Sequence, residues 1–281
     1  MKKRLAFGFS LALASASLAG MKEVNGHWIH EYPTKAQAPV HAASSSNITY
    51  HGGDILNAAK VVPIYWGSYW GSGTGATQRS TMNSFYQQFG TNSHYGVITQ
   101  YYDTTTGSTR YIGLSTLLNS GGDWYDSTNP SSAKVTDAMV QAEVNKYLNS
   151  HSFNNEAIYE VFTGPSYYSY DGGSTSCGGT HLAYCAYHGS YSHNGHTVKY
   201  SIEPYPSCSG CHASGFTVAQ DMQHFACHET REAVTDPVNA WWNGSTGYEA
   251  DDQCAWSPAP FTSGGYGYQY EWSNSAGGCV K

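Results

Sequence analysis

The run from Gln223 to Pro237, QHFACHETREAVTDP, constrains the fold most, because it specifies a helix and places reactive side chains on it. Residues three and four apart share one helix face, so His228 and Glu232 point the same way. Glu229 is offset beside His228. Apolar residues recur along the preceding turns, and Asp236-Pro237 stops the pattern, so we predict a helix from Phe216 to Thr235.

This helix carries a variant of a zinc-hydrolase signature. In H-E-x-x-H the two histidines bind zinc and the glutamate acts as a general base, whereas here glutamate stands in the second histidine position. A zinc hydrolase needs ligands on rigid elements, an open position for water and a base. His228 and Glu232 are therefore candidate metal ligands, and Glu229 is the candidate catalytic base.

A third ligand has to come from elsewhere, and Glu249 and Asp252 are both candidates. A turn at Asn243-Gly244 would return this acidic segment to the helix. The clustered carboxylates would repel one another without a counter-charge, and Arg231 is the nearby cation in the sequence. A divalent metal would relieve that repulsion. We expect Zn²⁺, with another divalent metal as the alternative, because two carboxylate ligands would make zinc-bound water less acidic.

Two other interpretations of the helix stay open. Glu229 and Glu232 could be the solvated face of an amphipathic helix, with His228 a buried histidine that has ordinary hydrogen-bond partners. Alternatively, His224 and His228 are also four residues apart and could form the ligand pair, which would leave both glutamates without a defined role.

The N-terminus predicts export. Residues 1–19 have a basic start, an apolar run and small residues near the end, which is the pattern of a signal peptide. We interpret residues 20–46 as a linker or pro-segment and residues 47–281 as one domain. No other segment is apolar for long enough to span a membrane. We expect a secreted, extracellular protein, with the periplasm as an alternative.

An exported protein meets oxidising conditions, so six of the seven cysteines are expected to form disulfides. The predicted pairs are Cys177–Cys185, Cys208–Cys211 and Cys254–Cys279, and Cys227 is left as the free thiol. A zinc or redox role for Cys208-x-x-Cys211 is the less favoured alternative. Four histidines in this region are expected in exposed loops, because their neighbours are small or polar: His181, His188, His193 and His196.

The remaining periodicity predicts an α+β protein, a mixed α/β layer with a disulfide-stabilised loop region. Helices are expected over residues 77–89 and after the N-cap residue Thr136. Strands rich in β-branched and aromatic residues are expected at 60–67, 95–102, 109–112, 157–163, 197–202 and 266–272. Pro63 places the first of these at a sheet edge or bulge.

The amino-acid composition limits the kinds of molecule that the protein is expected to bind. Charged residues make up 12% of the chain, the net charge is −7 and no basic run follows the N-terminus, so nucleic acid is not an expected partner. Aromatic residues are abundant, and core packing explains most of them. Trp66, Trp70, Trp241 and Trp242 nevertheless motivate a second hypothesis, a protein that binds cell-wall glycan or a partner protein.

Several segments together resemble the phosphate-induced protein 1 / EXORDIUM-like family, over about residues 47–279. The most specific matches are His228-Glu229-x-x-Glu232-Ala233-Val234-Thr235-Asp236-Pro237 and Glu249-x-x-Asp252-x-Cys254. The other matching segments are Tyr50-His51-Gly52-Gly53, Val62 to Trp70, Ile158 to Val161, Cys185 to His188 and Cys208-x-x-Cys211.

The resemblance implies a zincin-like single domain and a metal-dependent hydrolase, most naturally a peptidase acting on a peptide or protein substrate. Bacterial members look zincin-like at this motif. Many plant members lack the His-Glu pair and are associated with the extracellular matrix, which supports the alternative of a non-catalytic extracellular, cell-wall binding protein. A monomer is expected in either case.

Overall fold

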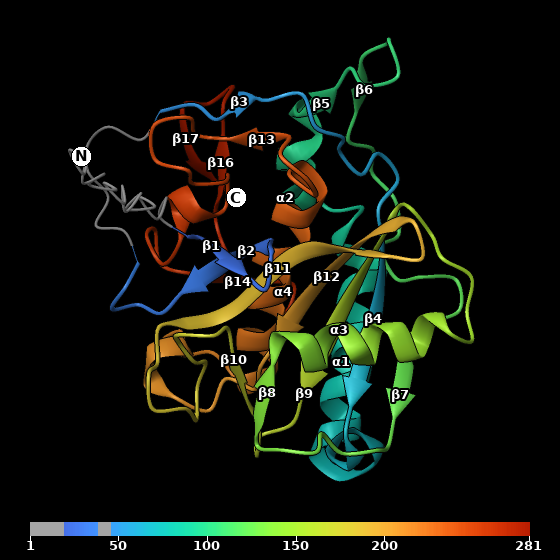
Figure 1. Ribbon diagram of the computed structural model, residues 1–281. Coiled ribbons are helices and arrows are strands. Elements are labelled where there is room, and N and C mark those ends of the chain that lie inside the picture. The colour runs from blue at the N-terminus through green and yellow to red at the C-terminus, as the bar shows by residue number, and fades with distance from the viewer. Residues whose placement is uncertain (1–19, 39–45) are drawn as a thin grey trace, which may run out of the picture.

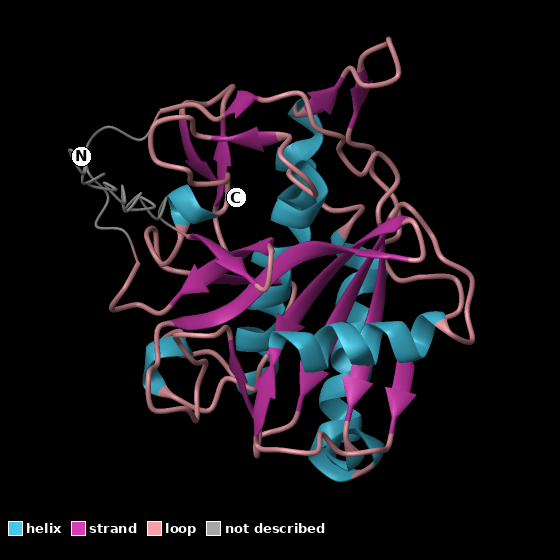
Figure 2. Ribbon diagram, viewed as in Figure 1, coloured by secondary structure: helices cyan, strands magenta, loops and turns pink. Residues whose placement is uncertain are grey.

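The computed structural model describes residues 20–38 and 46–281, and a seven-stranded mixed sheet runs through its centre (Figures 1 and 2). The predicted signal peptide, residues 1–19, lies outside the described residues. The strands follow in spatial order as β1 (Met21–Val24), β2 (His27–Pro33), β11 (Tyr184–His193), β12 (His196–Glu203), β9 (Ala157–Thr163), β4 (Lys60–Trp66) and β7 (Trp124–Asp126).

The centre of the sheet is parallel and its β1–β2–β11 side is antiparallel. All seven residues of β9 are buried, as expected for a parallel strand covered on both faces. The predicted strands at 60–67, 157–163 and 197–202 are confirmed by β4, β9 and β12. The mixed α/β class is therefore confirmed.

The edge position predicted from Pro63 is wrong, because β4 pairs with β9 on one side and with β7 on the other. Val61 donates its N–H to Leu117 on the β7 side. Backbone nitrogens two residues apart in a strand point to the same side, so the Pro63 nitrogen also faces the β7 side. It lies just before Ile64–Trp124, the first residue pair between β4 and β7. The interruption of the ladder at this point accommodates a residue that has no N–H to donate.

Helices cover both faces of the sheet (Figure 1). α3 (Asp137–Leu148) lies on one face, and α1 (Gly73–Phe89) and α4 (Val218–Thr235) lie on the other. Thr136 caps α3 as predicted, since its hydroxyl accepts the Met139 N–H. α4 begins with a capping box formed by Thr217 and Gln220. The sheet divides the core between its two faces, and α4 closes one of them.

Residues 95–102 are largely helical, so the strand predicted there is wrong. Asn92 accepts hydrogen bonds from the N–H groups of His94 and Tyr95, which nucleates α2 (Ser93–Gly96) and a 3₁₀ turn after it. The other short elements are paired strands: β5 (Tyr102–Asp103) with β6 (Arg110–Tyr111), β3 (Thr49–Tyr50) with β13 (Trp241–Trp242), β8 (Lys134–Thr136) with β10 (Tyr168–Tyr170), β14 (Phe261–Ser263) with β15 (Tyr266–Tyr268), and β16 (Glu271–Ser273) with β17 (Gly278–Val280).

The N-terminal segment is part of the sheet. β1 and β2 form a hairpin, and β2 pairs antiparallel with β11, so the expectation of irregular linker is wrong for Met21 to Pro33. The alternation in this stretch places Ile29 in the core beneath α3 and Tyr32 against α4. Whether the segment is removed as a pro-segment stays a prediction, and residues 39–45 lie outside the described residues.

The disulfides are Cys177–Cys208, Cys185–Cys211 and Cys254–Cys279, and Cys227 is buried and free. The two local pairs predicted around Cys185 and Cys208 are wrong. Cys185 lies within β11, and the β11–β12 hairpin brings the chain back so that Cys208 and Cys211 face segments far away in sequence. The pair at the C-terminus and the free Cys227 are confirmed. No helix of the described residues is long and apolar enough to cross a bilayer.

Glu143 on α3 makes stability depend on pH. Burial, together with a hydrogen bond to Asp126 and repulsion from it, raises the pKa of Glu143 to about 8. Folding then favours the protonated form, so this contribution is present at low pH and is lost as pH rises from about 4.3 through 8. We expect Glu143→Gln to raise the melting temperature relative to wild type by more at pH 9 than at pH 5.

Thermal unfolding across this pH range measures the effect, and Glu23→Gln at an exposed position is the control. A constant difference between wild type and Glu143→Gln from pH 5 to pH 9 would contradict the assignment.

Candidate metal centre

α4 carries His228 and Glu232 on the same face. His228 and Glu232 lie one turn apart, with 3.0 Å between Nε2 and the Oε2 oxygen, and both are fully buried. The Gln269 side-chain amide lies 3.2 Å from the other ring nitrogen of His228 and holds the ring in place. The helix periodicity predicted from the sequence is therefore what brings these two side chains together.

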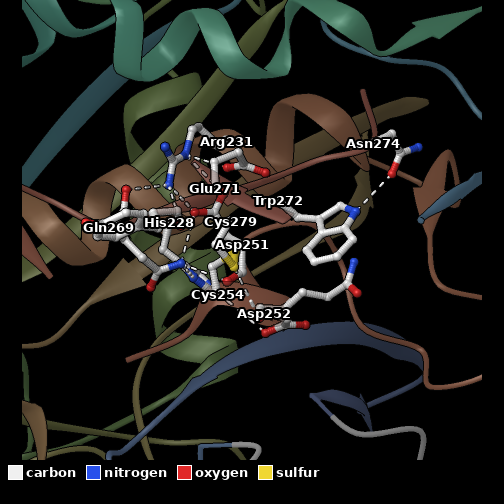
Figure 3. Close-up of a disulfide and its surroundings, with 12 residues drawn as sticks. His228, Arg231, Asp251, Asp252, Cys254, Gln269, Glu271, Trp272, Asn274 and Cys279 are labelled. Carbon is white, nitrogen blue, oxygen red and sulfur yellow. Dashed lines mark hydrogen bonds and ion pairs between the residues drawn. A yellow bond between two sulfur atoms is a disulfide. The ribbon is translucent and has the colours of Figure 1, made fainter. Parts of the chain in front are cut away.

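Asp252 reaches the same place from the C-terminal segment. Its Oδ1 atom is 3.8 Å from His228 Nε2, and its backbone N–H donates to Glu232 at 2.9 Å. The residue opens a 3₁₀ turn, Asp252–Cys254, that the Cys254–Cys279 disulfide ties to β17 (Figure 3). His228, Glu232 and Asp252 thus form one group of buried candidate ligands whose ligand atoms lie within 4.8 Å of one another.

The sheet supplies two histidines. His188 on β11 pairs directly with His30 on β2, and their rings stack at 4.9 Å between centroids. Side chains alternate along a strand, so these rings face α4 while Tyr187 and Ile29 face the opposite core. The structure therefore brings two histidines from distant segments to the helix.

Glu249 belongs with these histidines. Its Oε2 atom is 2.6 Å from His30 Nδ1 and 3.5 Å from His188 Nε2. Of the two acidic candidates from the tail, Asp252 thus approaches His228, and Glu249 approaches the sheet histidines. His30, His188 and Glu249 form a second group of candidate ligands.

Glu229 lies between the two groups. Its Oε2 atom is 3.0 Å from His188 Nδ1, and it clusters with His188 and Glu232. The position beside His228 that the sequence indicated for a base therefore adjoins both groups of ligands. Glu229 is fully buried.

Within residues 20–38 and 46–281, no Lys or Arg side chain forms an ion pair with the carboxylates of the two groups. Burial, followed by repulsion from neighbouring carboxylates, raises the pKa values of Glu229, Glu232 and Glu249 well above the usual range. Burial lowers the pKa of His188 well below 6.5 and that of His30 to about 4, which leaves neutral imidazoles suited to metal binding.

Arg231, the cation that the sequence offered, is used elsewhere. Its Nε atom is 3.0 Å from Asp251 and 2.7 Å from Glu271, and its guanidinium also donates to backbone carbonyls (Figure 3). Among the described residues it forms no ion pair with the carboxylates of the two ligand groups. A bound cation would therefore supply the missing charge.

Unpartnered atoms point to the same conclusion. In the part of the chain that the structure describes, His228 Nε2 and Glu229 Oε1 are buried without a hydrogen-bond partner, although His228 Nε2 lies 3.0 Å from a carboxylate. Two ligands bonded to one zinc at about 2.0–2.2 Å lie roughly 3–3.5 Å apart at tetrahedral angles. The residues present thus fit a divalent metal by donor type and by their unsatisfied lone pairs, and the 3.0 Å between His228 and Glu232 matches this spacing.

Two sequence expectations about histidines change. His188 is not an exposed loop residue but is buried in β11, whereas His181 is exposed in a loop as predicted. His193 ends β11 and is partly exposed, and His196 begins β12 and is exposed, so the predicted loop is wrong for both. Tyr187 and Tyr191, an even number of residues apart, lie on one face of β11, and these aromatic residues are the strand signal that could have found His188. His224 donates to or accepts from the Tyr32 hydroxyl at 2.7 Å and belongs to neither group, so the His224–His228 pair is not formed.

A cavity of about 460 Å³ opens at the sheet end of the cluster. Its wall includes His30, His188, Asp236 and the partly exposed Trp242. The other tryptophans singled out as binding residues, Trp66, Trp70 and Trp241, are buried in the core.

No family model, curated protein or solved structure matches the chain. The residues of the site are therefore the basis for any function assigned to it.

The Arg231 ion pairs should be essential for folding. Arg231→Gln would leave Asp251 and Glu271 buried without a counter-charge, and we expect a loss of about 3–5 kcal/mol in the free energy of unfolding. Denaturant unfolding measures it. The double variant Arg231→Gln/Glu271→Gln should recover part of the loss because it removes one uncompensated charge. A loss of under about 1 kcal/mol in the single variant would show that Arg231 is not needed to balance these carboxylates.

Proposed function

We propose that this protein is a secreted metal-dependent hydrolase, with a peptide or protein as its substrate. The observation that carries the proposal is the convergence of His228, Glu232 and Asp252 in one buried group, with Glu229 beside it. Zinc is the metal that fits this nitrogen and oxygen donor set best, and another divalent ion is the alternative.

Asp252 is favoured over Glu249 as the third ligand of this metal. Asp252 lies 3.8 Å from His228 Nε2, whereas Glu249 makes its closest contacts with His30 and His188. Three protein ligands leave a coordination position for water, as catalytic zinc sites require. The bound metal would supply Lewis-acid polarisation of the substrate carbonyl.

Glu229 serves as the general base. Its carboxylate takes a proton from the attacking water, whose oxygen forms a bond to the carbonyl carbon. The carbon–nitrogen bond then breaks, and the amine leaves with the proton that Glu229 returns. His188 is a positioning residue in this scheme, because its Nδ1 atom lies 3.0 Å from Glu229 and holds the carboxylate in place.

A zincin-like relationship to the EXORDIUM-like family remains part of the proposal, supported by the sequence motifs described above. Export is supported by three disulfides. The alternative of a non-catalytic glycan-binding protein loses support from the burial of Trp66, Trp70 and Trp241, since a binding platform needs exposed aromatic faces.

Substitution of the base separates chemistry from metal binding. Glu229→Gln should keep the metal and lower peptide hydrolysis by about 10²–10⁴-fold, the usual contribution of a general base. Asp252→Asn should release one metal per chain and lose activity as well. Metal content is measured by mass spectrometry after gel filtration, and hydrolysis is measured on a mixed peptide library.

Glu23→Gln, at an exposed position outside the cluster, is the control and should behave as wild type. A wild-type protein that binds no divalent metal, with all these side chains intact, would overturn the proposal. Full activity in Glu229→Gln would overturn the role of the base.

A further inference from the structure

The proposed function assigns no metal to one group of candidate ligands. His30 comes from β2, His188 from β11 and Glu249 from the C-terminal segment, so three separate parts of the chain converge there. His188 is 2% exposed and Glu249 is fully buried. The metal held by His228 does not account for these three side chains.

Four of their polar atoms lack a hydrogen bond to any residue that the structure describes. These buried atoms are His30 Nδ1, His188 Nε2 and both carboxylate oxygens of Glu249. Leaving a buried polar atom without a partner is unfavourable, and leaving a buried charge without one is more so. A further group bound by these four atoms would satisfy them.

The orientation of His188 fits a metal ligand. Its Nδ1 atom lies 3.0 Å from Glu229, and its Nε2 atom points to Glu249 at 3.5 Å. A metal-bound histidine usually donates its other ring N–H to a carboxylate, which fixes the tautomer and the ring orientation. Glu229 fills that role, so the Nε2 lone pair is directed at the space shared with His30 and Glu249.

We infer that His30, His188 and Glu249 bind a second divalent cation, separate from the one held by His228, Glu232 and Asp252. Two imidazole nitrogens and a carboxylate favour zinc or a similar transition metal over calcium or magnesium. The cavity of about 460 Å³ is lined by His30 and His188, so a position remains for water or a substrate oxygen.

The two sites are linked through the proposed base. Glu229 adjoins Glu232 on one side and His188 on the other, so a cation on His188 would fix the position of the Glu229 carboxylate. The catalytic meaning of the second cation rests on the proposed function, but its binding does not. A direct contact between His30 and Glu249, 2.6 Å apart, is the alternative without a metal, and it leaves His188 Nε2 unpartnered.

Metal stoichiometry tests the inference on the full chain. The protein is stripped with chelator and titrated with Zn²⁺ by calorimetry, and metal content is measured after gel filtration. Wild type should bind two ions per chain. His30→Gln and Glu249→Gln should each bind one, Asp252→Asn should bind one, and His30→Gln/Asp252→Asn should bind none.

His193→Gln is the matched control, because this histidine lies on the same strand as His188 but outside both groups, and it should bind two ions. Circular dichroism verifies that each variant is folded. With Co²⁺ in place of Zn²⁺, Asp252→Asn should keep a visible absorption band that His30→Gln/Asp252→Asn lacks, which reports the second site without any activity assay.

The outcomes separate this inference from the proposed function. One ion in both wild type and His30→Gln, with none in Asp252→Asn, overturns the second site and leaves the proposed function standing. One ion in wild type and Asp252→Asn, with none in His30→Gln, keeps this site and overturns the ligand set of the proposed function. Two ions in both His30→Gln and Glu249→Gln also overturn the inference.

Discussion

The burial of several carboxylates between α4 and the sheet is the constraint on which the rest of the structure depends. Glu229, Glu232, Glu249 and Asp252 are all shielded from water, and Arg231 is held by a different acidic pair. Buried charges are tolerated when they are paired or bind a metal. The buried carboxylates are therefore better explained as a site for cations than as part of a hydrophobic core.

The scaffold brings rigid elements to this cluster from several directions. A capped helix of 18 residues presents its polar face to the sheet, and the antiparallel side of the sheet presents His188 and His30 in register. The Cys254–Cys279 disulfide and the Arg231 ion pairs hold the C-terminal segment that carries the acidic residues (Figure 3). Each candidate ligand is thus placed by backbone structure or a cross-link, which is the preorganisation that a metal site would require.

Local sequence signals predicted the elements whose stability is local. Periodicity and stop signals predicted the α4 helix, with His228 and Glu232 on one of its faces, and the buried strand β9. The same reasoning missed His188, because its glycine- and serine-rich surroundings suggested a loop. It missed His30, because residues 20–46 were interpreted as a linker or pro-segment. It also paired Cys185 with its neighbour in sequence, whereas the β11–β12 hairpin brings Cys211 to it.

By itself the sequence determined that one helix carries His228, Glu229 and Glu232 on adjoining positions, since helical spacing depends only on the local backbone. Tertiary structure alone decided which acid approaches which imidazole. Asp252 and Glu249 are only three residues apart, yet Asp252 lies near His228 and Glu249 lies near His30 on the sheet. The 3₁₀ turn at Asp252–Cys254 and the Cys254–Cys279 disulfide fix this arrangement. Contacts between residues far apart in sequence depend on how the sheet, helix and tail pack together, and no local pattern encodes that packing.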